Sequence, residues 1–263
     1  TDADNSTSLC TDTVKNVVLA TEVVPAGKTA PAQIDRALQA MLTWRRPVYI
    51  EVYANAWTDT CRAPKGKLAP GKLPLSKRSL DRAVKHALAR LEGAQVPVIW
   101  AGVEVQRFGL QGLLEKVIET TALPWTTDLL GKSLLSEDHP GYQGCFDGAS
   151  AIKNVMDLFN ASSWVLGLGN LVTDDFADWV LDHYDNMILA YNNSVRVGKD
   201  HYENVPLAAF MEEIVARLGK KKYHAPRGAL AAIERVPTPG EKARKRLAAL
   251  APLHRVAGGD RGT

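Results

Sequence analysis

Apolar residues along the chain form two kinds of pattern, short continuous runs and stretches with helical spacing. Four short runs rich in β-branched or aromatic residues predict buried strands: 96–102, 123–127, 163–169 and 186–191. Four other stretches carry apolar residues every three or four positions, as on one helix face: 79–93, 110–118, 151–159 and 205–218. Since parallel strands need crossover connections, the alternation predicts an α/β fold: an open parallel sheet with helices on both faces.

A smaller α/β piece precedes this region. Pro31 opens a helix with Ile34 and Leu38 on one face, and the β-branched run 47–52 that follows is typical of a strand at the edge of a parallel sheet. We therefore expect residues 1–60 to be part of an α/β domain that lacks most of its own sheet. Such a piece exposes apolar surface, so dimerisation or aggregation is expected.

Two stretches lack apolar periodicity and mark the domain boundaries. Residues 61–78 are rich in Lys, Pro and Gly, and we interpret them as a linker. Ser79 is a plausible N-cap for the next helix, so the main domain is expected to span 79–219. Residues 220–263 contain only one short helical pattern and are expected to form a second linker toward a missing domain.

Charge and composition exclude several classes of protein. The 263 residues are 46% hydrophobic, and 32 Lys and Arg against 29 Asp and Glu leave a net charge of +3. That balance does not suit nucleic-acid binding, and the basic runs within 62–78 and after 220 are not interleaved with aromatic residues. No nucleic-acid partner is expected.

Cysteine usage and hydropathy indicate a cytoplasmic protein without a membrane span. The three cysteines, Cys10, Cys61 and Cys145, are far apart, which argues against a disulfide framework and a zinc cluster. The polar N-terminal residues do not resemble a secretory signal, and no apolar run is long enough to cross a bilayer.

Motifs for catalysis or phosphate binding are weak. Gly167-Leu168-Gly169 follows a strand, but Val172 stands where a dinucleotide fingerprint needs a small residue, so a tight turn is favoured over nucleotide contact. Gly131-Lys132-Ser133 lacks the earlier glycine of a phosphate loop and is interpreted as a turn. His139 has acidic neighbours that could orient its imidazole, although a turn stabilised by Asp138 explains the same residues. The six histidines show no spacing that suits a metal site.

The order of several segments resembles a known enzyme family. The segment Pro97 to Gly148, which includes Gly131-Lys132-Ser133, is similar to the central domain of thiamine-diphosphate-dependent 2-oxo acid decarboxylases of the pyruvate, indolepyruvate and phenylpyruvate type. Residues 34–52 resemble the last helix and strand of the pyrimidine-binding domain in the same family. Segments 166–174 and 201–207 also fit, so the resemblance covers roughly residues 12 to 218 in one colinear order.

The resemblance implies cofactors that this chain is not expected to hold. In the family, thiamine diphosphate lies between two other domains, which supply an activating glutamate and a Gly-Asp-Gly to Asn magnesium motif. Neither part is recognised here, and Gly259-Asp260 is too short to serve as that motif. We therefore expect a fragment of a decarboxylase that is inactive alone, without catalytic, cofactor-binding or metal-binding residues of its own. Its partners would be the missing catalytic domains or further copies in a homo-oligomer.

In some branches of the family the central domain carries effector or nucleotide sites. In substrate-activated pyruvate decarboxylases a cysteine follows the first strand of this domain, and Glu104 stands near that place here. The residues expected to line such a cleft lie near strand ends: Gly102, Val103, Glu104, Arg107, Gly131, Lys132, Gly167 and Gly169. Two alternatives remain open, a stand-alone module that binds NADP, FAD or ADP, and a module for oligomerisation.

Overall fold

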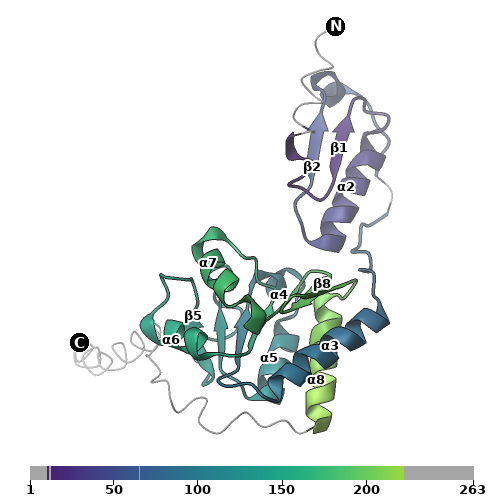
Figure 1. Ribbon diagram of the computed structural model, residues 1–263. Coiled ribbons are helices and arrows are strands. Elements are labelled where there is room, and N and C mark those ends of the chain that lie inside the picture. Colours follow the sequence, from purple (N-terminus) through teal and green to yellow (C-terminus); the bar gives the residue numbers. More distant parts are fainter. Residues whose placement is uncertain (1–10, 12, 65, 222–263) are drawn as a thin grey trace, which may run out of the picture. The chain divides into compact units, whose positions relative to one another are not determined.

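The protein consists of two compact units, and the boundary between them in the sequence lies between Pro74 and Leu75. The computed structural model describes residues 11, 13–64 and 66–221 (Figure 1). The division between the units lies within the stretch interpreted as a linker, 61–78. The two units are described separately, and they are called unit 1 and unit 2.

Unit 2 is built on a seven-stranded sheet with the order β5-β4-β3-β6-β7-β8-β9. Its strands are β3 (Val98–Ala101), β4 (Trp125–Thr127), β5 (Tyr142–Cys145), β6 (Val165–Leu168), β7 (Met187–Tyr191), β8 (Ser194–Val197) and β9 (Asp200–Glu203). All neighbours from β5 to β7 run parallel, which confirms the predicted α/β class.

The last two strands are antiparallel, unlike the wholly parallel sheet that was predicted. Tyr191 pairs with Ser194, and Val197 pairs with Asp200, so each connection has only two residues. Asn192 and Gly198 adopt positive φ angles of 43° and 56°. Tight hairpin turns need such angles, and Asn and Gly adopt them at the lowest cost, which explains why the chain reverses here.

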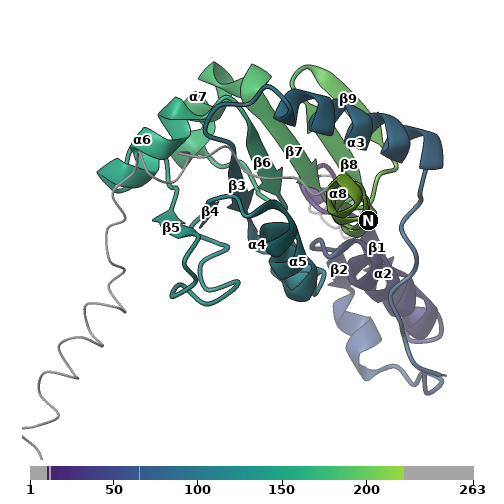
Figure 2. The same cartoon turned by 90° about the horizontal axis from the view of Figure 1, so that it is seen from below.

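Helices cover both faces of this sheet, as Figures 1 and 2 show. One face packs against α3 (Lys77–Leu91), α4 (Val103–Arg107), α5 (Gln111–Thr121) and α8 (Leu207–Lys221). The opposite face packs against α6 (Lys153–Ala161) and α7 (Asp174–Asp182). A short turn of 3-10 helix, η2 (Tyr184–Asn186), leads from α7 into β7. No described helix is long and apolar enough to cross a membrane.

The two faces have separate apolar cores because successive strand side chains point in opposite directions. Ile99 and Leu166 pack toward α3, α5 and α8. Trp100 and Val165 pack toward α6 and α7, where three phenylalanine rings lie edge-on to the Trp100 indole at centroid distances of 5.1 to 5.9 Å. Burial on both faces explains why β3 and β6 appear in the sequence as continuous apolar runs.

The first helix of unit 2 begins earlier than predicted. Ser76, rather than Ser79, is the N-cap residue of α3, and its Oγ accepts a hydrogen bond of 3.2 Å from the backbone N–H of Ser79. Ser76 is extended and lies three residues before that amide, the spacing at which a serine oxygen satisfies a free N–H in the first helical turn. The Ser79 assignment was therefore wrong.

Unit 1 contains a two-stranded parallel sheet, β1 (Thr21–Val24) and β2 (Tyr49–Val52), with one helix, α2 (Ala30–Trp44), and a 3-10 turn, η1 (Ala54–Thr58). The apolar pattern predicted α2 and β2 but not β1. Pro31 lies in the first turn of α2, as expected. In the part of unit 1 that the structure describes, the buried apolar residues are small: Val24, Ala37 and Ala56.

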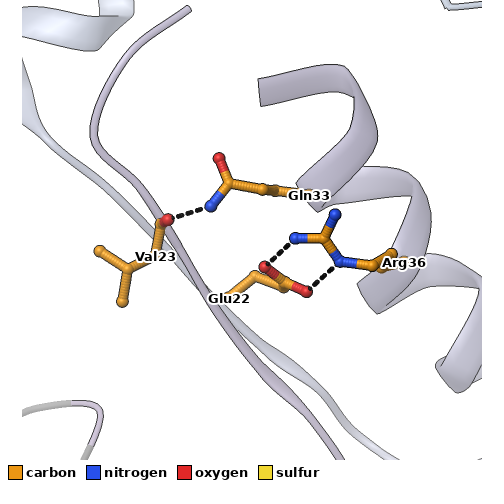
Figure 3. A network of polar contacts seen from close by, with 4 residues as sticks. All are labelled: Glu22, Val23, Gln33 and Arg36. Carbon is orange, nitrogen blue, oxygen red and sulfur yellow. Dashed lines mark hydrogen bonds and ion pairs between the residues drawn. The ribbon is translucent and has the colours of Figure 1, made fainter. Parts of the chain in front are cut away.

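Polar contacts join α2 to β1 (Figure 3). The Arg36 guanidinium donates two hydrogen bonds to the Glu22 carboxylate, at 2.8 and 2.9 Å. Gln33 donates from Nε2 to the carbonyl oxygen of Val23. Because the Arg36 side chain is largely exposed, its ion pair orients the helix more than it stabilises the fold.

Candidate functional site at the carboxyl edge of the sheet

The strand order of unit 2 creates a switch point between β3 and β6. From β3 the chain moves outward to β4 and β5, and it then returns to β6 on the other side of β3. The loops that leave the carboxyl ends of β3 and β6 therefore depart in opposite directions. In open α/β sheets, ligands commonly bind at such a point.

Here the two loops are in direct backbone contact. Gly102 donates from its N–H to the carbonyl oxygen of Leu168 at 2.8 Å, and Glu104 donates to that of Gly169 at 2.9 Å. A Cβ atom on Gly102 would lie 2.4 Å from both the Gly169 oxygen and the Asn170 Cα. Gly169 has a φ angle of 73°, which other residues rarely adopt. Close packing between the loops thus accounts for both glycines.

The other two predicted glycines, Gly131 and Gly167, are also buried and lie against adjacent strands. A Cβ atom on Gly131 would lie 2.8 Å from the carbonyl oxygen of Ala101, at the end of β3. On Gly167 it would lie 2.6 Å from Leu189 Cδ2. The loops after β3, β4 and β6 therefore meet around these glycines, so the structure brings the four glycines of the predicted cleft to one edge of the sheet.

A buried carboxylate joins two of these loops. Asp128 directly follows β4, and its side chain accepts hydrogen bonds from the Gly131 N–H at 2.6 Å and from Asn170 Nδ2 at 3.0 Å. Burial raises the pKa of Asp128, an effect that the two hydrogen bonds oppose and that the nearby Asp147 charge increases. Asp128 thus fixes the loop after β4 to the loop after β6.

A second buried carboxylate holds the turn after β7. Glu104, in α4, accepts a hydrogen bond of 2.7 Å from the backbone N–H of Asn192, the residue with positive φ in the β7–β8 turn. Val103, at the start of α4, is half-buried. Glu104 therefore connects the loop after β3 with the turn after β7, and this contact supplies a structural reason for an acidic residue at that position.

The two basic residues of the predicted cleft are exposed to solvent, whereas its glycines are buried. Arg107 ends α4 and Lys132 lies in the turn after β4, and both side chains are exposed. Binding of an effector or nucleotide by the predicted set stays a prediction. Sequence reasoning did not single out Asp128, Asn170 or Asn192. Asp128 and Asn192 directly follow buried strands, and Asn170 lies two residues after β6, so a position just past a buried strand was the signal that could have identified them.

Other titratable groups near this edge have structural partners. The His139 Nδ1 accepts hydrogen bonds from Trp125 Nε1 and from the Gly141 N–H, both at 3.0 Å, so the turn and not a carboxylate orients the ring. Burial raises the pKa of the Cys145 thiol to about 11, with a further contribution from Asp147. Because the thiol stays protonated near neutral pH, Cys145 is a poor nucleophile.

Comparison with known proteins agrees with this architecture. The family model described as "Thiamine pyrophosphate enzyme, central domain" matches residues 84–218, just over half of the 263 residues. A pyruvate decarboxylase of Hanseniaspora uvarum is 24% identical over 213 residues, which cover 78% of this chain and 37% of that protein. An indole-3-pyruvate decarboxylase of Azospirillum brasilense is 26% identical over 209 residues, 76% of this chain and 38% of its own length.

A third relative, pyruvate decarboxylase isozyme 1 of Saccharomyces cerevisiae, is 27% identical over 164 residues, 60% of this chain and 29% of its own length. The chain thus spans between 29% and 38% of the length of these three relatives. The family match falls within unit 2 and includes every strand of its sheet. The chain belongs to the thiamine pyrophosphate enzyme family, and unit 2 corresponds to the central domain of that family.

Proposed function

We propose that unit 2 serves as the central domain of a thiamine diphosphate- and magnesium-dependent 2-oxo acid decarboxylase, and that unit 1 is the end of its pyrimidine-binding domain. The substrate class is pyruvate, indolepyruvate or phenylpyruvate. The observation that carries the proposal is the family match over residues 84–218, together with relatives named pyruvate and indole-3-pyruvate decarboxylase. In this proposal the chain is inactive without the catalytic domains.

The carboxyl edge of unit 2 does not fit thiamine diphosphate. A small pocket of about 110 Å³ lies there, with Asp128, Asp147 and Asp175 in its wall and no basic residue among its described lining. Both Asp128 oxygens already accept hydrogen bonds from protein groups. Within the described residues no group of three or more His, Cys, Asp or Glu side chains is placed to hold a metal. An acidic pocket repels a diphosphate unless a cation neutralises it, so we derive no catalytic step at this edge.

The role that we propose for unit 2 is structural or effector-binding. Its sheet is buried on both faces, and the contacts of Gly102, Asp128 and Glu104 join the loops after β3, β4, β6 and β7 at one edge. Such a body holds neighbouring domains at a fixed spacing. Unit 1 has a small core and would complete it against the catalytic domains or another copy in a homo-oligomer. A cytoplasmic location is part of the proposal, and the free thiols of Cys61 and Cys145 are compatible with it.

Binding of NADP, FAD or ADP by a stand-alone module is the alternative. In that reading the nucleotide would lie outside the carboxyl ends of β3 and β6, beside the loops that Gly102 and Gly169 join. Isothermal titration with NADPH, FAD and ADP tests it, because heat that saturates with any of the three supports the module.

The proposed function is tested by adding thiamine diphosphate, Mg²⁺ and each of the three 2-oxo acids to the 263-residue chain and measuring CO₂ release. We expect no release above a protein-free blank and no saturable heat when thiamine diphosphate is titrated. A pyruvate decarboxylase with all its domains serves as the positive control, and cooperative unfolding of the chain shows that it is folded. Turnover by the chain alone would contradict the proposal.

A further inference from the structure

A second pocket lies on the α7 side of the sheet, near the ends of β6 and β7, and its volume is about 380 Å³. Most of its wall is apolar, with Val180 and Leu181 from α7, Leu189 and Tyr191 from β7, and Tyr184 from η2. We propose that this pocket binds a small organic anion, a monocarboxylate with a flat apolar body that carries an O–H or N–H donor.

The cationic group is Arg196 on β8. Of the described residues that line the pocket, Arg196 alone is charged. Its guanidinium lies over the Tyr184 ring, 4.5 Å from the ring centroid, and no described carboxylate lies within ion-pair distance of it. Stacking holds the guanidinium plane in place and leaves its N–H edge available, which suits a carboxylate bound through two hydrogen bonds.

The polar complement is the side chain of Asn170. Its Nδ2 donates to Asp128, whereas its Oδ1 is buried and has no hydrogen-bond partner in the described structure. A Cβ atom on Gly167 would lie 3.0 Å from this oxygen and 2.6 Å from Leu189 Cδ2, so the oxygen lies beside the apolar wall of the pocket. An unsatisfied buried acceptor is costly, and a donor on the ligand would satisfy it after a small rotation of the Asn170 side chain brings the oxygen to the pocket wall.

Size and charge together favour a monocarboxylate over a nucleotide. Small-ligand sites are mostly apolar with a few polar groups that fix orientation, which matches one guanidinium and one amide oxygen in this wall. A diphosphate would carry at least two charges toward a single arginine. The inference deepens the effector-binding role proposed for unit 2 and rests on it, but its test measures binding to this chain and requires no decarboxylation.

Calorimetric titration of the 263-residue chain with 4-hydroxyphenylacetate tests the proposal, since this probe has a carboxylate, a ring and an O–H donor. We expect saturable binding, weakened about tenfold or more in the neutral 4-hydroxyphenylacetamide. Phenylacetate, which lacks the donor, should bind more weakly than the hydroxylated probe. AMP should not bind at this pocket.

Two substitutions locate the site. Arg196→Gln removes the cation, and Leu181→Glu places a like charge at a side chain that is 69% exposed and lines the pocket, so its effect on folding should be small. Each should weaken binding of 4-hydroxyphenylacetate about tenfold or more. The matched control is Leu129→Glu, at a leucine that is 58% exposed and does not line this pocket, and it should leave the affinity unchanged.

Three results would overturn the proposal: no saturable heat with 4-hydroxyphenylacetate, equal affinity for the acid and its amide, or equal weakening by Leu181→Glu and Leu129→Glu. Circular dichroism verifies that each variant is folded. If Arg196→Gln unfolds the chain, the comparison between the two leucine variants still decides the outcome.

Discussion

The two units of the chain use similar elements but differ in how much apolar surface they bury. Unit 2 has large side chains such as Trp100, Trp125 and Trp164 fully buried between its sheet and helices. Unit 1 has two strands and one long helix, and among its described residues no buried apolar side chain is larger than Val24. Its tryptophan Trp57 is 75% exposed. The same βα pattern is thus complete in one unit and partial in the other.

This difference explains which unit should be stable by itself. A parallel sheet is normally covered on both faces, and two strands with one helix rarely supply enough buried area to offset the entropy of ordering the chain. Unit 2 meets this condition through its two cores. We expect unit 1 to need further contacts for its stability, as it would under the proposal that it completes a catalytic domain.

The largest expected effect is on the free energy of unfolding, when one tryptophan of each unit is replaced by alanine. Trp100→Ala should lower the free energy of unfolding by about 3–5 kcal/mol, because a large fully buried ring is lost from the aromatic cluster. The matched change Trp57→Ala, at a side chain that is 75% exposed, should alter it by less than about 0.5 kcal/mol. Urea denaturation followed by circular dichroism measures both values. Similar losses in the two variants would break the distinction between the units.

A smaller effect is expected for the buried carboxylate of unit 2. Since burial raises the pKa of Asp128 in the folded state, the native protein holds this proton more tightly than the unfolded chain. Protonated Asp128 therefore stabilises the folded state fully at a pH below the aspartate pKa of the unfolded chain. This stabilisation is lost as the pH rises through the higher pKa of Asp128 in the folded state.

Asp128→Asn should remove this part of the pH dependence while keeping a polar group between Gly131 and Asn170. Melting temperatures between pH 4 and pH 8 measure the change, and their fall with rising pH should be less steep in the variant than in the unmodified chain. Asp157→Asn, at an exposed aspartate paired with Lys153, is the control. An equal change in slope for both variants would argue against a special role of Asp128.

The sequence predicted those elements whose environment repeats along the chain. Both faces of β3 and β6 are buried, so their apolar runs were clear. In contrast, β8 alternates half-buried and buried residues over only four positions, and β9 is polar and exposed apart from Tyr202, so these strands were missed. Their pairing depends on hairpin turns that apolar periodicity does not report.

The candidate site was predicted less completely than the fold. The glycines stood out in the sequence because a glycine after a strand often marks a tight turn or a close backbone contact. The structure brings them to one edge of the sheet. Asp128 and Asn170 are 42 positions apart, and only the strand order β4-β3-β6 brings them into contact. Arg196 follows the unpredicted β7–β8 turn. Such contacts follow from topology, which local patterns do not specify.

Hydrogen exchange of the 263-residue chain, followed by mass spectrometry, tests most directly whether unit 2 is complete and unit 1 is not. Amides of β3 and β6 should exchange about a hundredfold or more slowly than those of β1 and β2, because only the former open with the global unfolding of a covered sheet. Equal protection of the two sheets in the isolated chain would contradict the account.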